Sequence, residues 1–182
     1  RSHMISWCPA STTLSFSYSA LEVCLMGLYP KHKGYITTEH REQALESLKL
    51  FRVYHLAHKD YLFLSSGEKK LVDLARTFVN DNQLIILDEP TAYLDRKNMF
   101  TVFDVIQKKV KDGKTIIIAT HDIEKACDIC DNIIFLKNGE ILSQTKIENK
   151  RIPELIAETF DIKVSQIKNP ENNAKILSFS AK

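Results

Sequence analysis

Uninterrupted apolar runs mark the strands of this 182-residue chain. Gln83–Leu87 shows no polar alternation, and Thr115–Thr120 is rich in β-branched residues. Such runs are typical of strands buried on both faces of a parallel sheet. Ile5–Cys8 is a third short, β-favouring run, and Pro9 ends it. The pattern predicts a strand at each of these three runs.

Residues 10–80 show mainly the apolar spacing of helices. Ala20–Leu28 predicts one helix, and Thr38–Phe51 predicts a second one behind a threonine cap. We expect these two helices to pack together. Lys97–Lys111 predicts a later amphipathic helix, which Gly113 closes.

A further helix is predicted to start at Ser65. Glu68 stands three residues on, which is the spacing of a capping box: the Ser65 hydroxyl accepts from the Glu68 amide, and the Glu68 carboxylate reaches back to the Ser65 amide. Four apolar residues then follow at helical spacing: Leu71, Leu74, Ala75 and Phe78.

The C-terminal part predicts a hairpin, a helix and two strands. The hairpin joins Asn132–Leu136 to Glu140–Ser143 through Asn138-Gly139, a dipeptide that suits positive φ at both turn positions. A helix is predicted to run from Ile152-Pro153 to about Phe160. The two strands are predicted near Ile162–Val164 and Ala174–Phe179. Strands and helices alternate along the chain, which predicts an α/β fold.

Composition narrows the class but does not choose a partner. With 44% hydrophobic residues and a net charge of +2, the chain fits one ordinary domain and shows no charge field for nucleic acid or an anionic membrane. No run of eighteen apolar residues occurs, so we expect any membrane link to go through another protein. Four cysteines without a signal peptide favour a reducing cytoplasm. Cys127 and Cys130 have CxxC spacing but no partner ligands, so we interpret them as small core residues.

Candidate chemistry lies where the predicted strands end. Asp88 and Glu89 follow one run and His121 follows another, and open α/β folds bind ligands at this edge of the sheet. Asp88 suits a hydrated magnesium ion, and Glu89 suits a base for water that attacks a phosphate. The amides of Ser65–Gly67 start a helix and suit an anion. Each feature alone also fits an ordinary strand end, helix start or surface histidine; together they predict one phosphate-facing edge.

The order of these motifs resembles the ATP-binding subunit of ABC transporters. The matching stretches are Leu64–Glu68, Leu84–Thr91, Tyr93–Asp95 and Thr120–Asp122, within about Ile5–Ser143. The resemblance implies an α/β, P-loop NTPase (ABC ATPase) core, mostly parallel, with a helical signature subdomain and an incomplete N-terminus. It implies ATP and Mg2+ as cofactors. Its implied partners are a second ATP-binding subunit in a homodimer and membrane permease subunits, with no nucleic acid, at the cytoplasmic face of the cell membrane.

The resemblance also assigns roles to single residues. The signature motif would consist of Ser65, Ser66, Gly67 and Glu68. In the family this motif contacts the γ-phosphate of ATP that is held by the opposite subunit. Asp88 would be the Walker B magnesium carboxylate, and Glu89 the general base. Tyr93, Leu94 and Asp95 would form the D-loop at the dimer interface, with Asp95 a nucleotide-binding candidate. His121 would be the catalytic switch residue that senses the γ-phosphate.

Three departures limit what this chain is expected to do alone. Ser66 stands where the signature usually has glycine, and Ala10 stands where the Q-loop glutamine is expected. No GxxxxGK followed by Ser or Thr occurs, and Gly113-Lys114-Thr115 runs from helix into strand, the reverse of a phosphate loop. We therefore expect the C-terminal portion of a longer ATPase, inactive by itself and with exposed apolar sheet surface. A naturally degenerate subunit is the rival explanation.

Five segments are expected along the chain. We interpret residues 1–3 as a vector remnant, residues 4–14 as a strand and Q-loop region, and residues 15–80 as the helical signature subdomain. Residues 81–145 would be a RecA-like core with the Walker B, D-loop and switch histidine, and 146–182 a C-terminal extension.

Substrate and wider class stay open. Met26–Pro30, Phe160–Val164 and Asn169–Glu171 resemble importers of iron chelates, haem and cobalamin, which favours metal-chelate import. ATPases of DNA double-strand-break repair and chromosome maintenance share the main motifs but carry a long coiled coil before the signature. Residues 38–63 contain only one helix of about four turns, far short of sustained heptads. A non-hydrolysing regulatory ABC subunit is the third alternative.

Overall fold

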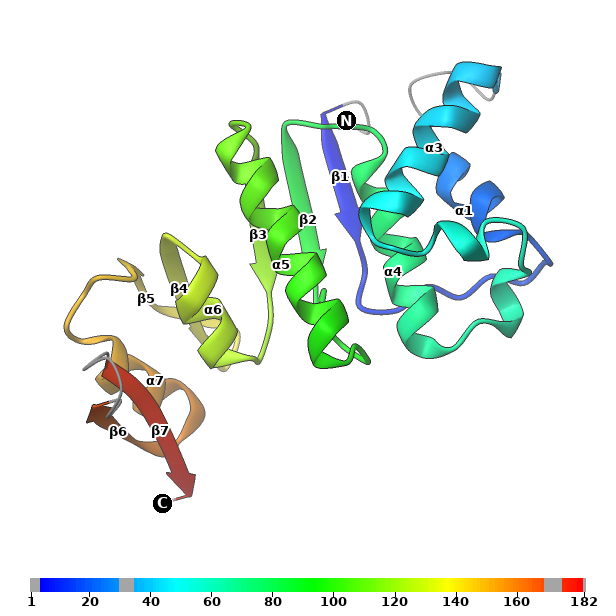
Figure 1. Ribbon diagram of the computed structural model, residues 1–182. Helices are drawn as coiled ribbons and strands as arrows, with labels where there is room; N and C mark the ends of the chain where they lie inside the picture. The colour runs from blue at the N-terminus through cyan, green and yellow to red at the C-terminus, as the bar shows by residue number, and fades with distance from the viewer. Residues whose placement is uncertain (1–3, 30–34, 169–174, 182) are drawn as a thin grey trace. The chain divides into compact units, whose positions relative to one another are not determined.

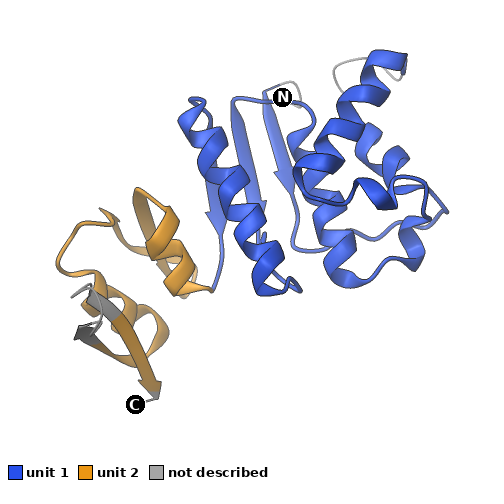
Figure 2. Cartoon of the chain, viewed as in Figure 1, with its two compact units in different colours: residues 1–121 blue, residues 122–182 orange. Residues whose placement is uncertain are grey.

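The computed structural model describes residues 4–29, 35–168 and 175–181 (Figure 1). Its contacts divide the chain into two compact units, residues 1–121 and residues 122–182, which we describe separately (Figure 2). Several features expected from the sequence lie outside the described residues: the vector remnant, Pro30, Asn169–Glu171 and Ala174. The five-segment division of the chain stays a prediction.

Unit 1 is built around a parallel sheet. Among the described residues its strands are ordered β1 (Ile5–Cys8), β2 (Leu84–Asp88) and β3 (Thr115–Ala119), each at the place predicted. Trp7 pairs with Ile86, and Ile86 pairs with Ile117. Because the strands are parallel, their carboxyl ends meet at one edge, as the candidate site requires.

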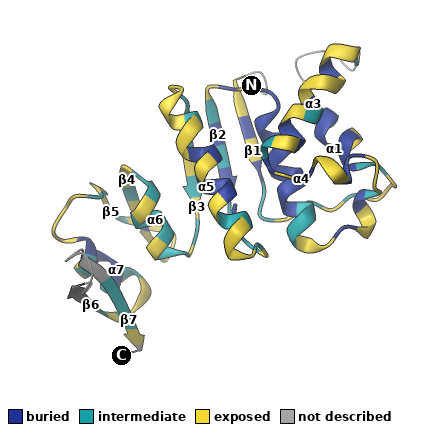
Figure 3. Cartoon of the chain, viewed as in Figure 1, coloured by how far each residue is buried: buried dark blue, intermediate teal, exposed yellow. Residues whose placement is uncertain are grey.

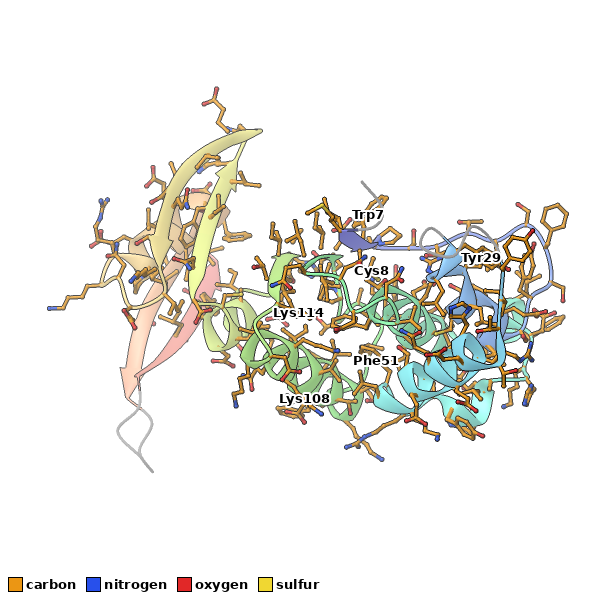
Figure 4. The ribbon with its side chains drawn as sticks, turned by 90° about the horizontal axis from the view of Figure 1, so that it is seen from above. Trp7, Cys8, Tyr29, Phe51, Lys108 and Lys114 are labelled. Carbon is orange, nitrogen blue, oxygen red and sulfur yellow. The ribbon has the colours of Figure 1, made fainter. Side chains whose placement is uncertain are left out.

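The predicted burial of β2 and β3 on both faces is wrong. Burial alternates along β2: Ile85 and Leu87 are buried, and the other three residues of the strand are only half-buried. No residue of β3 is buried (Figure 3). Trp7 is 62% exposed and Ile117 is 52% exposed. Figure 4 shows Trp7 pointing away from the helices of unit 1 and Cys8 pointing toward them.

Topology explains the one-sided burial. The strand order advances in one direction from β1 to β3, and parallel crossovers are right-handed, so the crossover helices α4 (Ser66–Phe78) and α5 (Arg96–Lys111) lie on the same face. In unit 1 no described element covers the opposite face, which leaves its apolar side chains exposed.

A helical cluster packs beside the sheet, where α1 (Ala20–Met26) contacts both α3 (Thr38–Leu50) and α4, as predicted for the first two. The rings of Phe51 and Phe78 meet edge to face, with centroids 5.4 Å apart. Two short 3-10 turns, Tyr54–Leu56 and Tyr61–Phe63, lead into α4. The predicted helical region begins later than expected, because residues 10–18 form no helix.

Unit 2 contains the predicted hairpin and helix. Its elements are α6 (Ile123–Ile129), β4 (Asn132–Lys137), β5 (Glu140–Lys146), α7 (Ile152–Phe160), β6 (Ile162–Lys168) and β7 (Lys175–Ala181). Asn138 and Gly139 both have positive φ, which confirms the predicted turn. β6 and β7 pair antiparallel. Four buried residues form the core of the unit, with Cys127 packed against them: Phe135, Ile152, Leu155 and Ile156.

Across the described parts of the chain, no helix combines the length and the hydrophobicity that a membrane span requires.

Candidate functional site

Glu89 and His121 are in direct contact at the carboxyl edge of the sheet. His121 Nδ1 lies 2.7 Å from Glu89 Oε1, and the His121 backbone N–H donates to the same oxygen at 3.0 Å. The Thr120 hydroxyl donates to Glu89 Oε2 at 3.3 Å. The two residues follow neighbouring strands, so the parallel pairing of β2 and β3 brings the two predicted catalytic residues together.

The backbone of Glu89 is held in an unusual conformation. Its φ of 45° is in the left-handed region, and its N–H donates to the Ala119 carbonyl at 2.8 Å. Such a conformation persists only where surrounding contacts hold it, and it is enriched at functional sites. The side chain of Glu89 is 25% exposed and that of His121 is 82% exposed. A carboxylate on Nδ1 favours the tautomer that carries a hydrogen on that nitrogen.

Asp88 offers one carboxylate beside this pair. It is the last residue of β2 and is half-buried. In the parts of the chain that the structure describes, no group of three or more His, Cys, Asp or Glu side chains forms a metal cage. One carboxylate still fits magnesium, which keeps several waters and takes its other ligands from phosphates. Asp88 would hold the ion in this way.

The predicted capping box is present at the start of α4. The Ser65 amide and hydroxyl both donate to Glu68 Oε2 at 2.8 Å, and the Glu68 amide donates to the Ser65 hydroxyl at 3.3 Å. The hydrogen bonds from the Ser65 amide and hydroxyl lower the pKa of Glu68. Ser66 and Gly67 occupy the first turn, where a helix supplies no carbonyl partner for the N–H groups. These two amides can therefore bind an anion.

The stretch Tyr93–Asp95 lies against this helix start. A Cβ built on Gly67 would come within 2.9 Å of the Tyr93 carbonyl oxygen. Asp95 caps α5, because its carboxylate accepts from the Asn98 amide at 2.8 Å. The structure thus gives Asp95 a helix-capping role, and its assignment to nucleotide binding stays a prediction.

Sequence reasoning missed two residues of the site. Thr120 contacts Glu89, and its position just before His121 is the signal that could have found it. Lys70 is 3% exposed, and its ammonium contacts the carbonyl of Asp88. The sequence feature that could have revealed Lys70 is its position next to Leu71, close to the face of α4 that the apolar spacing predicts to be buried.

The structure also excludes the false phosphate loop. Gly113 has φ of 85° just after α5 and before β3, so the tripeptide leads from a helix into a strand, as predicted. Lys114 forms an ion pair with Asp81 at 3.0 Å. The described residues therefore fit the magnesium carboxylate and the anion site of a nucleotide-binding protein, but they do not fit a cradle for ATP phosphates.

These features define a class. A parallel α/β sheet with an Asp-Glu pair and a histidine at its carboxyl edge, beside an anion-binding helix start, is a P-loop NTPase type of core. Residues 1–92 match the protein family described as ABC transporter. The chain belongs to this family.

Curated relatives carry more specific names. The hemin import ATP-binding protein HmuV of Methylobacillus flagellatus is 27% identical over 172 residues, covering 91% of this chain and 64% of that protein. HmuV of Gloeobacter violaceus is 30% identical over 169 residues, covering 89% of this chain and 62% of that protein. The chain thus spans slightly less than two thirds of the length of these relatives.

Solved structures share the fold. One is described as an inward-facing conformation of a metal-chelate type ABC transporter. It matches with a TM-score of 0.84 at 23% identity, and the match covers 97% of this chain and 71% of that chain. The bacterial ABC transporter cassette MJ0796, solved as a dimer, has a TM-score of 0.75 at 31% identity and covers 82% of this chain and 65% of its own. Another structure of that cassette is described as a post-hydrolysis state with ADP and phosphate.

Proposed function

We propose that this chain supplies the catalytic carboxylate, the switch histidine and the signature helix of an ABC transporter ATPase. The contact of Glu89 with His121 is the main support for the proposal, because it places a carboxylate that can act as a base beside the histidine that would sense the γ-phosphate. Helix α4, with its anion-binding start, belongs to the same unit. Membership in the ABC transporter family supports ATP as the nucleotide.

The residues would divide the chemistry as follows. Glu89 would orient the attacking water and take its proton, once His121 turns its hydrogen bond from Glu89 toward phosphate. Asp88 would contribute a carboxylate to Mg2+, which neutralises phosphate charge when it is bound. The Ser66 and Gly67 amides would contact nucleotide held by a second subunit. The chain would therefore form half of a shared site.

Substrate, partners and location are also part of the proposal. The names of the two HmuV relatives and the metal-chelate type of the solved transporter support import of haem or another metal chelate. Such an ATPase would act as a dimer on permease subunits, peripheral to the cytoplasmic face of the cell membrane. Directly before the proposed signature, residues 38–63 contain only one helix of about four turns and no sustained heptads, so we favour transport over DNA repair.

Growth on haem tests this function in the cell. A strain that encodes the chain would be deleted for its gene and complemented with the wild type, with Glu89→Gln, or with Glu42→Gln as an exposed control on α3. We expect the wild type and Glu42→Gln to restore growth on haem as the iron source and Glu89→Gln to fail. Equal growth of all three complemented strains would contradict a hydrolytic role for Glu89.

Purified protein tests the shared site. The 182-residue chain alone is expected to show no ATP hydrolysis, because its sequence has no phosphate loop. Mixed with a hemin import ATP-binding protein that has such a loop, it should associate only when ATP and Mg2+ are present. Association with no gain in hydrolysis would favour the non-hydrolysing regulatory subunit. Hydrolysis by the chain alone, abolished by Glu89→Gln, would overturn the shared-site proposal.

A further inference from the structure

Lys70 joins three segments of unit 1 through one ammonium group. Its Nζ donates to the carbonyls of Pro9 at 3.1 Å, Ala10 at 3.2 Å and Asp88 at 3.0 Å. Pro9 and Ala10 follow β1, and Asp88 ends β2. The side chain therefore ties helix α4 to the ends of two neighbouring strands.

The surroundings of this group are unusual for a lysine. The residue is only 3% exposed, and none of the ion pairs in the described part of the chain includes it. Burying a charge is costly unless hydrogen bonds compensate for it. An ammonium has three N–H donors, and three carbonyl oxygens match that number. The position thus favours a compact cation with three donors over an apolar side chain of similar length.

The contacts also place Lys70 between the two halves of the candidate site. It lies in α4 one turn after Ser66, whose amide belongs to the proposed anion site. Its bond to the Asp88 carbonyl reaches the residue directly before Glu89. Glu89 has φ of 45°, a conformation that needs support from neighbouring contacts.

We propose that Lys70 is a positioning residue, which holds the Asp88-Glu89 pair and the loop after β1 in fixed relation to the start of α4. This inference rests on the proposed function for its meaning, since it assigns Lys70 to the geometry of the same site. Lys70 touches no reacting atom and acts through the backbone of Asp88.

Hydrogen–deuterium exchange of the 182-residue chain tests the inference without nucleotide. Lys70→Met keeps the length of the side chain and removes all three donors. We expect amide exchange in residues 10–12 and 89–94 to become about tenfold faster, with α5 changed by no more than about twofold. Ser47→Ala is the matched control, because it removes another buried hydrogen bond to α4, from the Ser47 hydroxyl to the Ala75 carbonyl at 2.7 Å.

The control separates positioning from a general loss of stability. Lys70→Met should accelerate amide exchange specifically in residues 10–12 and 89–94. Ser47→Ala should not accelerate exchange specifically in these two segments. If both variants accelerate exchange in those two segments equally, or if Lys70→Met accelerates neither, the inference is wrong. If Lys70→Met does not fold, Lys70→Gln decides by the same comparison, since it retains a polar side chain but loses the charge and the reach.

ATP hydrolysis by the mixture of this chain with a loop-bearing hemin import ATP-binding protein adds a second readout. Lys70→Met should lower kcat by about tenfold or more with KM for MgATP unchanged, because positioning acts on the reacting geometry rather than on nucleotide affinity. A rise in KM at constant kcat would contradict the inference. If the wild-type mixture shows no hydrolysis beyond that of the loop-bearing protein alone, the proposed function fails, and the exchange result still decides whether Lys70 holds the two strand ends.

Discussion

Gly67 and Tyr93 approach each other through their backbones, so closely that a Cβ on Gly67 would lie 2.9 Å from the Tyr93 carbonyl oxygen. Tyr93 has φ of 66° and a side chain that is 75% exposed, so its backbone, not its ring, makes this approach. Gly67 therefore has a reason to be small within this chain alone. That reason is separate from any phosphate it would contact in a partner.

Substituting Gly67 should consequently destabilise the chain in the absence of nucleotide. A methyl group would have to displace backbone atoms, which typically costs about 1–3 kcal/mol, so we expect Gly67→Ala to lower the free energy of unfolding by about that amount. Urea unfolding followed by the fluorescence of Trp7, the single tryptophan, measures it. Ser66→Ala, at the exposed neighbouring position, should change stability by less than about 0.5 kcal/mol. Equal stability of Gly67→Ala and wild type would show that the segment around Tyr93 can move away from Gly67 at no cost in free energy.

The capping box predicts a pH dependence of stability. The Ser65 amide and hydroxyl hold the pKa of Glu68 below its ordinary value of 4.5. A carboxylate with a lowered folded-state pKa stabilises the fold above the unfolded pKa, and this contribution is lost as the pH falls through the folded value. Glu68→Gln keeps the shape but loses the charge at the helix start, so it should be about 0.5 kcal/mol less stable at pH 7.

That difference should narrow as the pH falls below about 4.5. Urea unfolding at pH 7 and at a series of lower pH values tests it, with Glu42→Gln as a control for simple loss of a surface charge. A gap between wild type and Glu68→Gln that stays constant across the series, or that widens in acid, would rule out the titration of Glu68 as its source.

Local features were predictable from the sequence because they depend on residues close together in the chain. The cap at Ser65 needs only Glu68, and the turn at Asn138-Gly139 needs only two residues that tolerate positive φ. The pairing of Glu89 with His121 was also accessible, because parallel strands bring their carboxyl ends to one edge.

Burial and long-range bonds were not predictable in the same way. The sequence of an apolar strand shows the same pattern whether one or both faces of the sheet are covered. The exposure of Trp7 and Ile117 therefore could not be predicted, because it depends on which elements pack on the sheet. Lys70 was missed because its three carbonyl partners belong to segments about 20 and 60 residues away, and no local pattern marks them.

The exposed sheet face predicts association of the isolated chain. Trp7 and Ile117 lie on this face at 62% and 52% exposure, with half-buried Ile86 between them. Exposed apolar strands with a free edge tend to pair between chains. Light scattering should show a molecular mass that rises with concentration, and the emission of Trp7 should shift to shorter wavelength at the same time.

A charge on that face should suppress the association. Ile117→Lys places a lysine beside Ile86, and Ile134→Lys is the matched control, since Ile134 is 53% exposed on β4 in unit 2. We expect Ile117→Lys to keep the chain monomeric to a higher concentration than Ile134→Lys does. A stable monomer of the wild type at high concentration would count against association through this face.

The four cysteines should differ in reactivity according to their burial. Cys8 and Cys24 are fully buried in unit 1; burial raises the pKa of the Cys8 thiol and raises that of Cys24 to about 12. Cys127 and Cys130 are half-buried in unit 2, and burial also raises their pKa. The thiolate is the reactive form, so access and pKa both disfavour the first pair. Iodoacetamide at pH 8, followed by peptide mass spectrometry, should modify Cys127 and Cys130 first, and Cys8 and Cys24 only at the rate at which unit 1 opens. In urea all four should react at similar rates, and labelling of native Cys24 as fast as Cys127 would show that the helical cluster of unit 1 is open in solution.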